Sequence, residues 1–123
     1  MPTDQEIGRH AEELAAFFLC ENSYVILARN LRFPCGEIDI LVQDADGTIV
    51  IVEVKASEHS HAERSPIDRI TPQKQRKLMQ LAYQVAARYP DTNIRIDAVS
   101  LYWQGGEPQI SHFLNIIPHI SLT

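Results

Sequence analysis

The chain has 123 residues, of which 45% are hydrophobic and 22% charged, and it carries a formal net charge of −5. This length and composition predict a single soluble globular domain over residues 1–123, with one core. No apolar run reaches the length of a membrane span, and the first residues lack the pattern of a signal peptide. The absence of a long apolar run predicts no membrane partner, and the only two cysteines, Cys20 and Cys35, suggest reduced thiols in a cytoplasmic protein. The negative charge leaves any nucleic-acid binding to a local basic patch.

The predicted elements follow from capping residues and from the spacing of apolar residues. A first helix is expected over residues 4–20, because Thr3 and Glu6 form a capping box before an apolar stripe. A second helix begins after Thr71 and ends before Pro90. Strands are predicted at residues 24–31, about 37–43, 48–55, 94–103 and 109–117, the last as a strand or an extended tail. The order α-β-β-β-α-β-β indicates an α/β fold with a central mixed sheet flanked by helices.

The turn between the second and third strands decides which charged side chains share a face of the sheet. An Asp-Gly pair at residues 46–47 separates two apolar runs, which is a strong hairpin signal. A two-residue loop would place Asp39 opposite Val54, on the other face from Glu53. A three-residue loop that ends at Gly47 in the left-handed conformation places Asp39 opposite Glu53. We predict this second register, in which Glu37 faces Lys55 and one face gathers Glu37, Asp39, Glu53 and Lys55.

Ionised side chains inside apolar strands need a partner, because removing a charge from water is costly. Asp39 and Glu53 can share one or two hard cations such as Mg²⁺ or Mn²⁺ through their carboxylate oxygens. Lys55 can orient a water molecule or stabilise negative charge that develops on a phosphate. The alternative is an ordinary row of ion pairs on a half-exposed sheet face, because a Glu-x-Lys spacing is common by chance.

Short motifs distributed between residues 8 and 103 carry a family resemblance. They are Gly8 with Glu12 and Ala15, Asn30, Gly36-Glu37-Ile38-Asp39, Val52-Glu53-Val54-Lys55, Lys74-Gln75 and Ile96-Asp97. In this combination and order the chain resembles the YraN-like family of small bacterial proteins, which is related to archaeal Holliday junction resolvases. That family belongs to the restriction-endonuclease-like PD-(D/E)xK superfamily. The resemblance implies a restriction-endonuclease-like core and, by analogy, a symmetric homodimer.

The resemblance also implies roles for individual residues. Asp39, Glu53 and Lys55 fall on the catalytic triplet, with Asp39 and Glu53 as ligands of Mg²⁺ or Mn²⁺. Glu12 falls on a helix glutamate that completes the metal site, although the residues alone suggest a solvated helix charge. Glu37 is expected at the rim of the site. Asp97 is expected either to support the site from behind the metal ligands or to pair with Arg95 or a helix end.

Two departures from the family pattern concern the hairpin strands. Ile38, not proline, precedes Asp39. Ala56 and Ser57 stand where the family usually carries an arginine shortly after the Glu-Val-Lys element. The missing arginine removes one expected phosphate contact.

A basic cluster extends from the polar loop at residues 56–70 into the start of the second helix. The predicted nucleic-acid-binding residues are Arg64, Arg69, Lys74, Arg76 and Lys77. Lys74 and Lys77 are three residues apart and share a helix face near the positive end of the helix dipole, which favours phosphate. The alternative is a solvated helix end. His59 and His61 can ligate a transition metal, but two histidines in a polar loop are more often simply solvated.

Taken with the resemblance, these features predict a metal-dependent DNA endonuclease that hydrolyses phosphodiesters in branched or structured DNA. The alternative is a non-catalytic nucleic-acid-binding or scaffold protein that retains the nuclease fold. The acidic net charge and the missing arginine favour that alternative, while the intact Asp39, Glu53 and Lys55 set disfavours it. A nuclease that acts on RNA or on a protein-bound substrate is a third reading.

Overall fold

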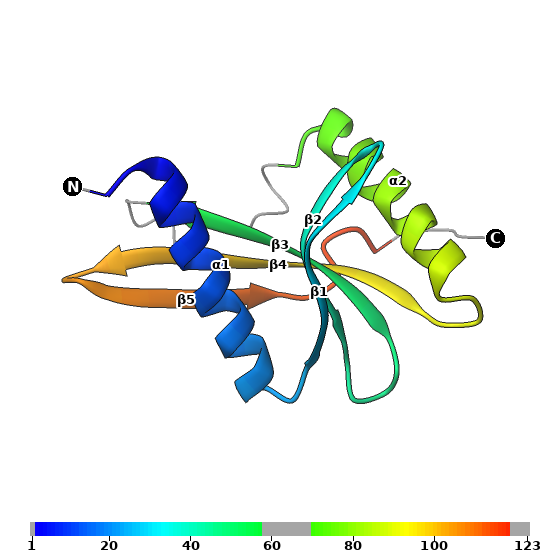
Figure 1. The fold of residues 1–123 in the computed structure, drawn as a ribbon, viewed down its shortest axis with the longest axis horizontal. Coiled ribbons are helices and arrows are strands. Elements are labelled where there is room, and N and C mark those ends of the chain that lie inside the picture. Colours follow the sequence, from blue (N-terminus) through cyan, green and yellow to red (C-terminus); the bar gives the residue numbers. More distant parts are fainter. Residues whose placement is uncertain (1, 58–69, 119–123) are drawn as a thin grey trace.

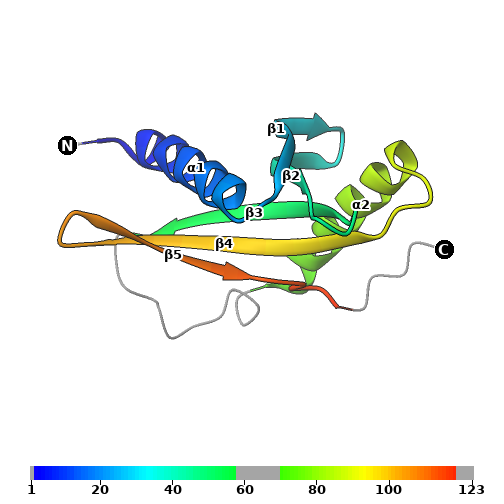
Figure 2. The same ribbon diagram turned by 90° about the horizontal axis from the view of Figure 1, so that it is seen from below.

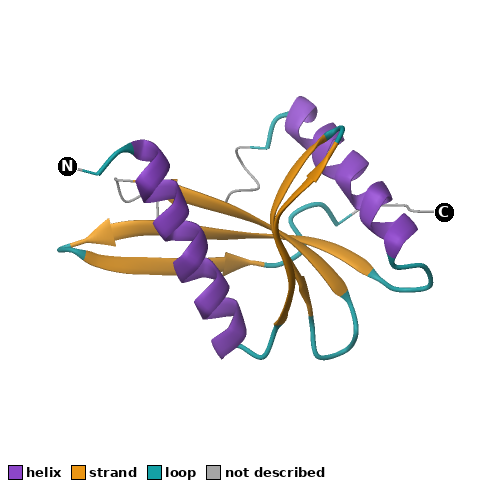
Figure 3. Ribbon diagram, viewed as in Figure 1, coloured by secondary structure: helices purple, strands orange, loops and turns teal. Residues whose placement is uncertain are grey.

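A computed structural model describes residues 2–57 and 70–118 of the chain, which form two helices and a five-stranded sheet (Figures 1 and 3). The elements are α1 (Asp4–Glu21), β1 (Val25–Phe33), β2 (Gly36–Gln43), β3 (Ile49–Ser57), α2 (Pro72–Arg88), β4 (Ile94–Gln104) and β5 (Glu107–Phe113). The predicted order α-β-β-β-α-β-β is therefore confirmed. No helix within the described ranges is long and apolar enough to cross a membrane.

The strands lie in the order β1-β2-β3-β4-β5, and β3 and β4 form the parallel pair. The other neighbouring strands are antiparallel, so the sheet is mixed, as predicted. A parallel pair requires a long crossover connection, and this connection contains α2. In Figure 2 the β1–β2 hairpin rises steeply from the β3–β4 plane.

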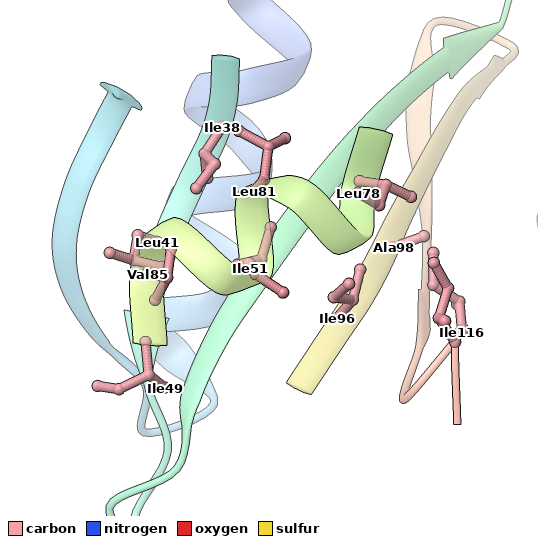
Figure 4. Close-up of a cluster of buried hydrophobic side chains, with 12 residues drawn as sticks. Ile38, Leu41, Ile49, Ile51, Leu78, Leu81, Val85, Ile96, Ala98 and Ile116 are labelled. Atoms are coloured by element: carbon pink, nitrogen blue, oxygen red, sulfur yellow. The ribbon is translucent and has the colours of Figure 1, made fainter. Parts of the chain in front are cut away.

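Adjacent residues of β3 point to opposite faces of the sheet and enter two separate cores. Ile51 lies in the cluster that includes Leu81 of α2, and Figure 4 shows these two side chains between helix and sheet. Val52 lies in the cluster that includes Leu19 of α1. Both faces of the central strands are therefore buried, which explains why their sequences are almost continuously apolar.

The helices begin where the capping residues predict. The Thr3 hydroxyl accepts a hydrogen bond from the Glu6 backbone N–H at 3.1 Å, and the Thr71 hydroxyl accepts one from the Lys74 N–H at 3.1 Å. Each cap satisfies a backbone donor that has no partner inside the helix. The cap at Thr71 fixes the first turn of α2, which carries Lys74 towards the sheet.

The three-residue loop of the β2–β3 hairpin is confirmed. The Asp44 backbone N–H donates to the Thr48 carbonyl at 2.9 Å, and Gly47 adopts a φ of +91°. Glycine adopts this left-handed backbone without the steric cost that a Cβ would add. The ladder then pairs Ile40 with Val52, which is the predicted register.

The end of the chain departs from the prediction. The last strand ends at Phe113, not near residue 117. Asn115 adopts a left-handed φ of 56°, which turns the backbone out of the strand. The Ile116 N–H then donates to the Ile96 carbonyl at 2.8 Å, and Ile116 enters the core beneath α2.

Candidate functional site

β2 and β3 separate at Asp39, and this fork is the centre of the candidate site. The last ladder pair before the fork joins Ile40 to Val52. Beyond this pair, the Asp39 carboxylate itself accepts a hydrogen bond from the Val54 backbone N–H, with Oδ2 at 2.9 Å from the nitrogen. The side chain thus replaces a ladder bond, and its carboxylate is fixed at the point where the strands diverge.

The fork also corrects one predicted contact. Because the ladder ends at Ile40, Glu37 is not held opposite Lys55. Glu37 instead pairs with Arg32 of β1, whose Nε lies 3.1 Å from Glu37 Oε2. The prediction of a Glu37–Lys55 pair is wrong because it extended the hairpin ladder past its end.

Glu53 lies close to two ammonium groups. Its side chain is 13% exposed, and its Oε1 lies 2.5 Å from Lys74 Nζ and 3.7 Å from Lys55 Nζ. Lys74 comes from α2, whereas Lys55 comes from the same strand and is 62% exposed. The shorter and less exposed of these two ion pairs therefore joins the helix to the sheet.

A pocket of about 230 Å³ lies at the fork, between β2, β3 and α2. Its polar wall is made of acidic and basic side chains, Glu37, Asp39, Glu53, Lys74 and Lys77. Its apolar wall is made of residues that also border the core beneath or beside it, Ile38, Ile51, Val52, Leu78 and Leu81. Since one water molecule occupies roughly 30 Å³ in the liquid, the pocket has room for a small hydrated ion.

Asn30 links two glutamates beside the fork. Its side-chain amide donates to Glu12 Oε1 at 2.9 Å and to Glu37 Oε1 at 3.1 Å. Asn30 has a left-handed φ of 52° within β1, a conformation that asparagine tolerates better than most residues. The family motifs include Asn30, but the sequence assigned it no role, because the bridge depends on three elements meeting.

Burial and neighbouring carboxylates disfavour the ionised forms of Asp39 and Glu12. Burial raises the pKa of Asp39, and the nearby Glu53 and Glu37 carboxylates raise it further against the lowering effect of the Val54 hydrogen bond. Burial also raises the pKa of Glu12, with a further contribution from Asp39. Such a gathering of partly desolvated carboxylates favours the binding of a cation.

The carboxylate oxygens around the fork are the type of ligand that a hard divalent cation prefers. Glu12, Asp39 and Glu53 offer only oxygen, which suits Mg²⁺ or Mn²⁺. Among the described residues, no group of three or more His, Cys, Asp or Glu side chains stands ready to hold a metal ion. The carboxylates are instead engaged by Asn30, by the Val54 N–H and by Lys74.

Asp97 lies away from this pocket. It pairs with Val52 across the β3–β4 ladder, and Val52 faces the α1 core, so Asp97 points to the opposite face from Glu53. Arg95 Nε lies 2.9 Å from its Oδ1, and His112 Nε2 lies 2.8 Å from its Oδ2. Asp97 therefore pairs with Arg95, which is one of its two predicted roles. It is not among the residues that line the pocket.

The predicted basic residues divide into three groups. Lys74 and Lys77 line the pocket, and the Lys77 side chain passes Gly36 so closely that a Cβ there would meet Lys77 Cε at 3.2 Å. Arg76 is exposed on α2 and is not among the residues that line the pocket. The remaining predicted residues, Arg64, Arg69, His59 and His61, lie outside the described residues.

Two solved structures are similar to part of the backbone of this chain. An EndoMS–dsDNA complex matches at a TM-score of 0.44 and 21% identity, over 70% of this chain and 34% of that one. A repair endonuclease from Pyrococcus abyssi matches at a TM-score of 0.44 and 22% identity, over 77% of this chain and 39% of that one. This chain thus spans well under half of either protein, and the likeness carries no inference about activity.

Sequence relatives match over most of their length. A UPF0102 protein from Aquifex aeolicus is 44% identical over 95 residues, which cover 77% of this chain and 84% of that protein. A UPF0102 protein from Clavibacter michiganensis is 36% identical over 116 residues, which cover 89% of this chain and 94% of that protein. Residues 11–101 match the family model described as "Uncharacterised protein family UPF0102". The chain is therefore a member of the UPF0102 family, the YraN-like family that its motifs predicted.

Proposed function

We propose that this protein is a metal-dependent DNA endonuclease that hydrolyses phosphodiester bonds in branched or structured DNA. One observation carries the proposal. Asp39 and Glu53, from two diverging strands, line a single pocket with Lys74 and Lys77 of α2. The pocket thus combines carboxylate oxygens for a hard cation with ammonium groups for a phosphate.

The acidic residues supply the proposed metal ligands. Asp39 and Glu53 would hold Mg²⁺ or Mn²⁺, with Glu12 as a third ligand or a contact through water. The ion, when bound, would provide Lewis-acid stabilisation of charge on a phosphoryl oxygen. Asp39 is well placed to act as the fixed ligand, because the Val54 N–H already orients its carboxylate.

The basic residues supply the proposed contacts to the substrate. Lys55 Nζ lies 3.7 Å from Glu53 Oε1 and its side chain is 62% exposed, so its ammonium group can reach a phosphate or orient water beside Glu53. Lys74, Lys77 and the exposed Arg76 lie in the first two turns of α2, where the helix dipole also favours an anion. Arg64 and Arg69 lie outside the described residues and stay proposed nucleic-acid contacts from the sequence. A homodimer, which the resemblance implies, would present two pockets to two strands.

Cleavage of labelled DNA tests the proposal. Single-stranded, duplex, flap and four-way-junction DNAs are incubated with Mg²⁺, Mn²⁺ or chelator. We expect cutting only with metal, and a loss of about 100-fold or more in both Glu53→Gln and Lys55→Ala. The first substitution weakens the proposed metal site, and the second removes a cation that can contact the reacting phosphate or orient water. Glu13→Gln is the matched control, because Glu13 is exposed on α1 and outside the pocket lining.

Two results would contradict the proposal. Cutting that survives both pocket substitutions would assign the activity to another site or to a contaminant. DNA binding without cutting under any metal would identify a non-catalytic binding protein that retains the fold.

A further inference from the structure

Lys74 forms an ion pair with Glu53, whose carboxylate the proposed metal site requires. Its Nζ lies 2.5 Å from Glu53 Oε1, and its side chain is 38% exposed. The Thr71 cap accepts the Lys74 N–H at 3.1 Å, so the backbone that carries this side chain is anchored at the start of α2. Lys74 thus reaches the carboxylate from a fixed position, with its ammonium group at the pocket wall.

A cation at Glu53 and the Lys74 ammonium group compete for the same oxygen. Both are positive, so a cation bound at this oxygen would repel the Lys74 ammonium group. Lys55 is a weaker competitor, because it lies 3.7 Å away and is more exposed to solvent. Displacement of Lys74 would leave its ammonium group at the pocket without a counter-ion. A phosphate in the pocket would supply that counter-ion.

We propose that Lys74 is an exchange ligand, which neutralises Glu53 in the metal-free protein and transfers to a substrate phosphate when a divalent cation binds. This inference rests on the proposed function. It predicts that cation and nucleic acid assist each other's binding, because each releases the partner that the other needs. By linkage, the two ligands must strengthen each other's binding by the same factor.

Binding of Mn²⁺ to the full chain without nucleic acid is the first test. Lys74→Met removes the competing charge, so it should bind Mn²⁺ about fivefold or more tightly than wild type. Lys77→Met is the matched control, because it removes an equal charge from the same pocket. Among the ion pairs of the described residues, Glu53 pairs with Lys55 and Lys74 but not with Lys77. Lys77→Met should therefore change Mn²⁺ affinity much less.

Binding of a labelled four-way junction, with Ca²⁺ or with chelator, is the second test. Ca²⁺ should tighten DNA binding by wild type about fivefold or more, and this gain should vanish in Lys74→Met. Lys74→Met should also bind DNA more weakly than wild type in Ca²⁺. A purely structural role for Lys74 predicts none of these opposite changes in metal and DNA affinity.

The outcomes separate this inference from the proposed function. If wild type binds Mn²⁺ through Glu53, as shown by loss in Glu53→Gln, but Lys74→Met binds no more tightly than Lys77→Met, the exchange is overturned and the metal site stands. If neither wild type nor Lys74→Met binds Mn²⁺, both proposals fall. Thermal unfolding of each variant checks that the fold is retained.

Discussion

Two aspartates on opposite faces of one sheet show how differently the same side chain is used. Asp97 is 0% exposed, and hydrogen bonds from His112, Arg95 and the Asn115 N–H outweigh burial and lower its pKa. Asp39 is only partly buried, yet burial and the neighbouring carboxylates raise its pKa. The more deeply buried acid is therefore the better stabilised one. The difference teaches that donors and nearby charge, more than depth, separate a structural carboxylate from one suited to binding a cation.

The surroundings of Asp97 explain its structural role. Arg95 lies against Asp97 and also donates to Asp44 Oδ2 at 3.1 Å and to the Tyr24 hydroxyl at 3.0 Å. This network joins β4 to the start of β1 and to the β2–β3 turn. His112 of β5 also hydrogen-bonds to Asp97, so this one buried carboxylate connects distant segments of the sheet.

Replacement of Asp97 by asparagine is expected to have the largest effect on stability. Asp97→Asn should lower the free energy of unfolding by about 3 kcal/mol, because it leaves the Arg95 charge poorly compensated and turns an amide donor towards other donors. Urea denaturation at pH 7 measures the loss. Asp44→Asn removes the more exposed partner of Arg95 and is the control with the smaller expected loss. Equal losses in the two variants would contradict the central role of Asp97.

Replacement of Asp39 by asparagine is expected to act in the opposite direction. Asp39→Asn keeps an oxygen that can accept the Val54 N–H bond and removes a charge that its neighbours oppose. The free energy of unfolding at pH 7 should stay level or rise by up to about 1 kcal/mol, while Mn²⁺ binding is lost. A destabilisation comparable with that of Asp97→Asn would show that the two aspartates do not differ as described.

The pH dependence of the Asp39→Asn effect sharpens this contrast. A carboxyl whose pKa is raised in the folded protein costs stability as the pH rises from its ordinary value of 3.8 through the folded value. The difference in free energy of unfolding between Asp39→Asn and wild type should thus be smallest below pH 3.8 and should shift in favour of Asp39→Asn as the pH rises towards neutral. Ionised Asp97 affects stability in the opposite direction, because its pKa is lowered in the folded protein. Its stabilising contribution is fully present above pH 3.8, the ordinary pKa, and is lost as the pH falls through the lower pKa of the folded protein. Urea midpoints across this pH range test both signs.

Replacement of Asn30 is expected to have the smallest effect on stability. Asn30→Gly removes the amide that bridges Glu12 and Glu37 but suits the left-handed backbone, so stability should change by less than about 0.5 kcal/mol. The pKa of Glu12 should rise further, because the Asn30 hydrogen bond is one of the contacts that lower it. An NMR titration of the Glu12 carboxyl measures this shift. Asn30→Ala, which adds the left-handed strain, should show the same shift with an extra loss of about 1 kcal/mol.

Local patterns in the sequence were sufficient for the order of elements, the helix starts and the hairpin register. Caps such as Thr3 and Thr71 act within a few residues, and Gly47 sets the turn through its own backbone freedom. These features depend on neighbours in the chain, so periodicity and turn chemistry predict them. This register by itself predicts that Asp39 and Glu53 lie close together on one face of the sheet.

Contacts between distant elements could be decided only by the tertiary structure. The β2–β3 ladder ends at Ile40, and the Asp39 side chain beyond it accepts the Val54 N–H. Lys74 reaches Glu53 because the crossover returns α2 to this face. The Asn30 bridge and the position of Asp97 on the opposite face of the sheet likewise depend on how strands and helices pack. The sequence by itself determined which charged groups the chain carries into its sheet. The packing decided which of them neutralise one another and which remain to bind a ligand, because charges respond to neighbours in space and not to spacing along the chain.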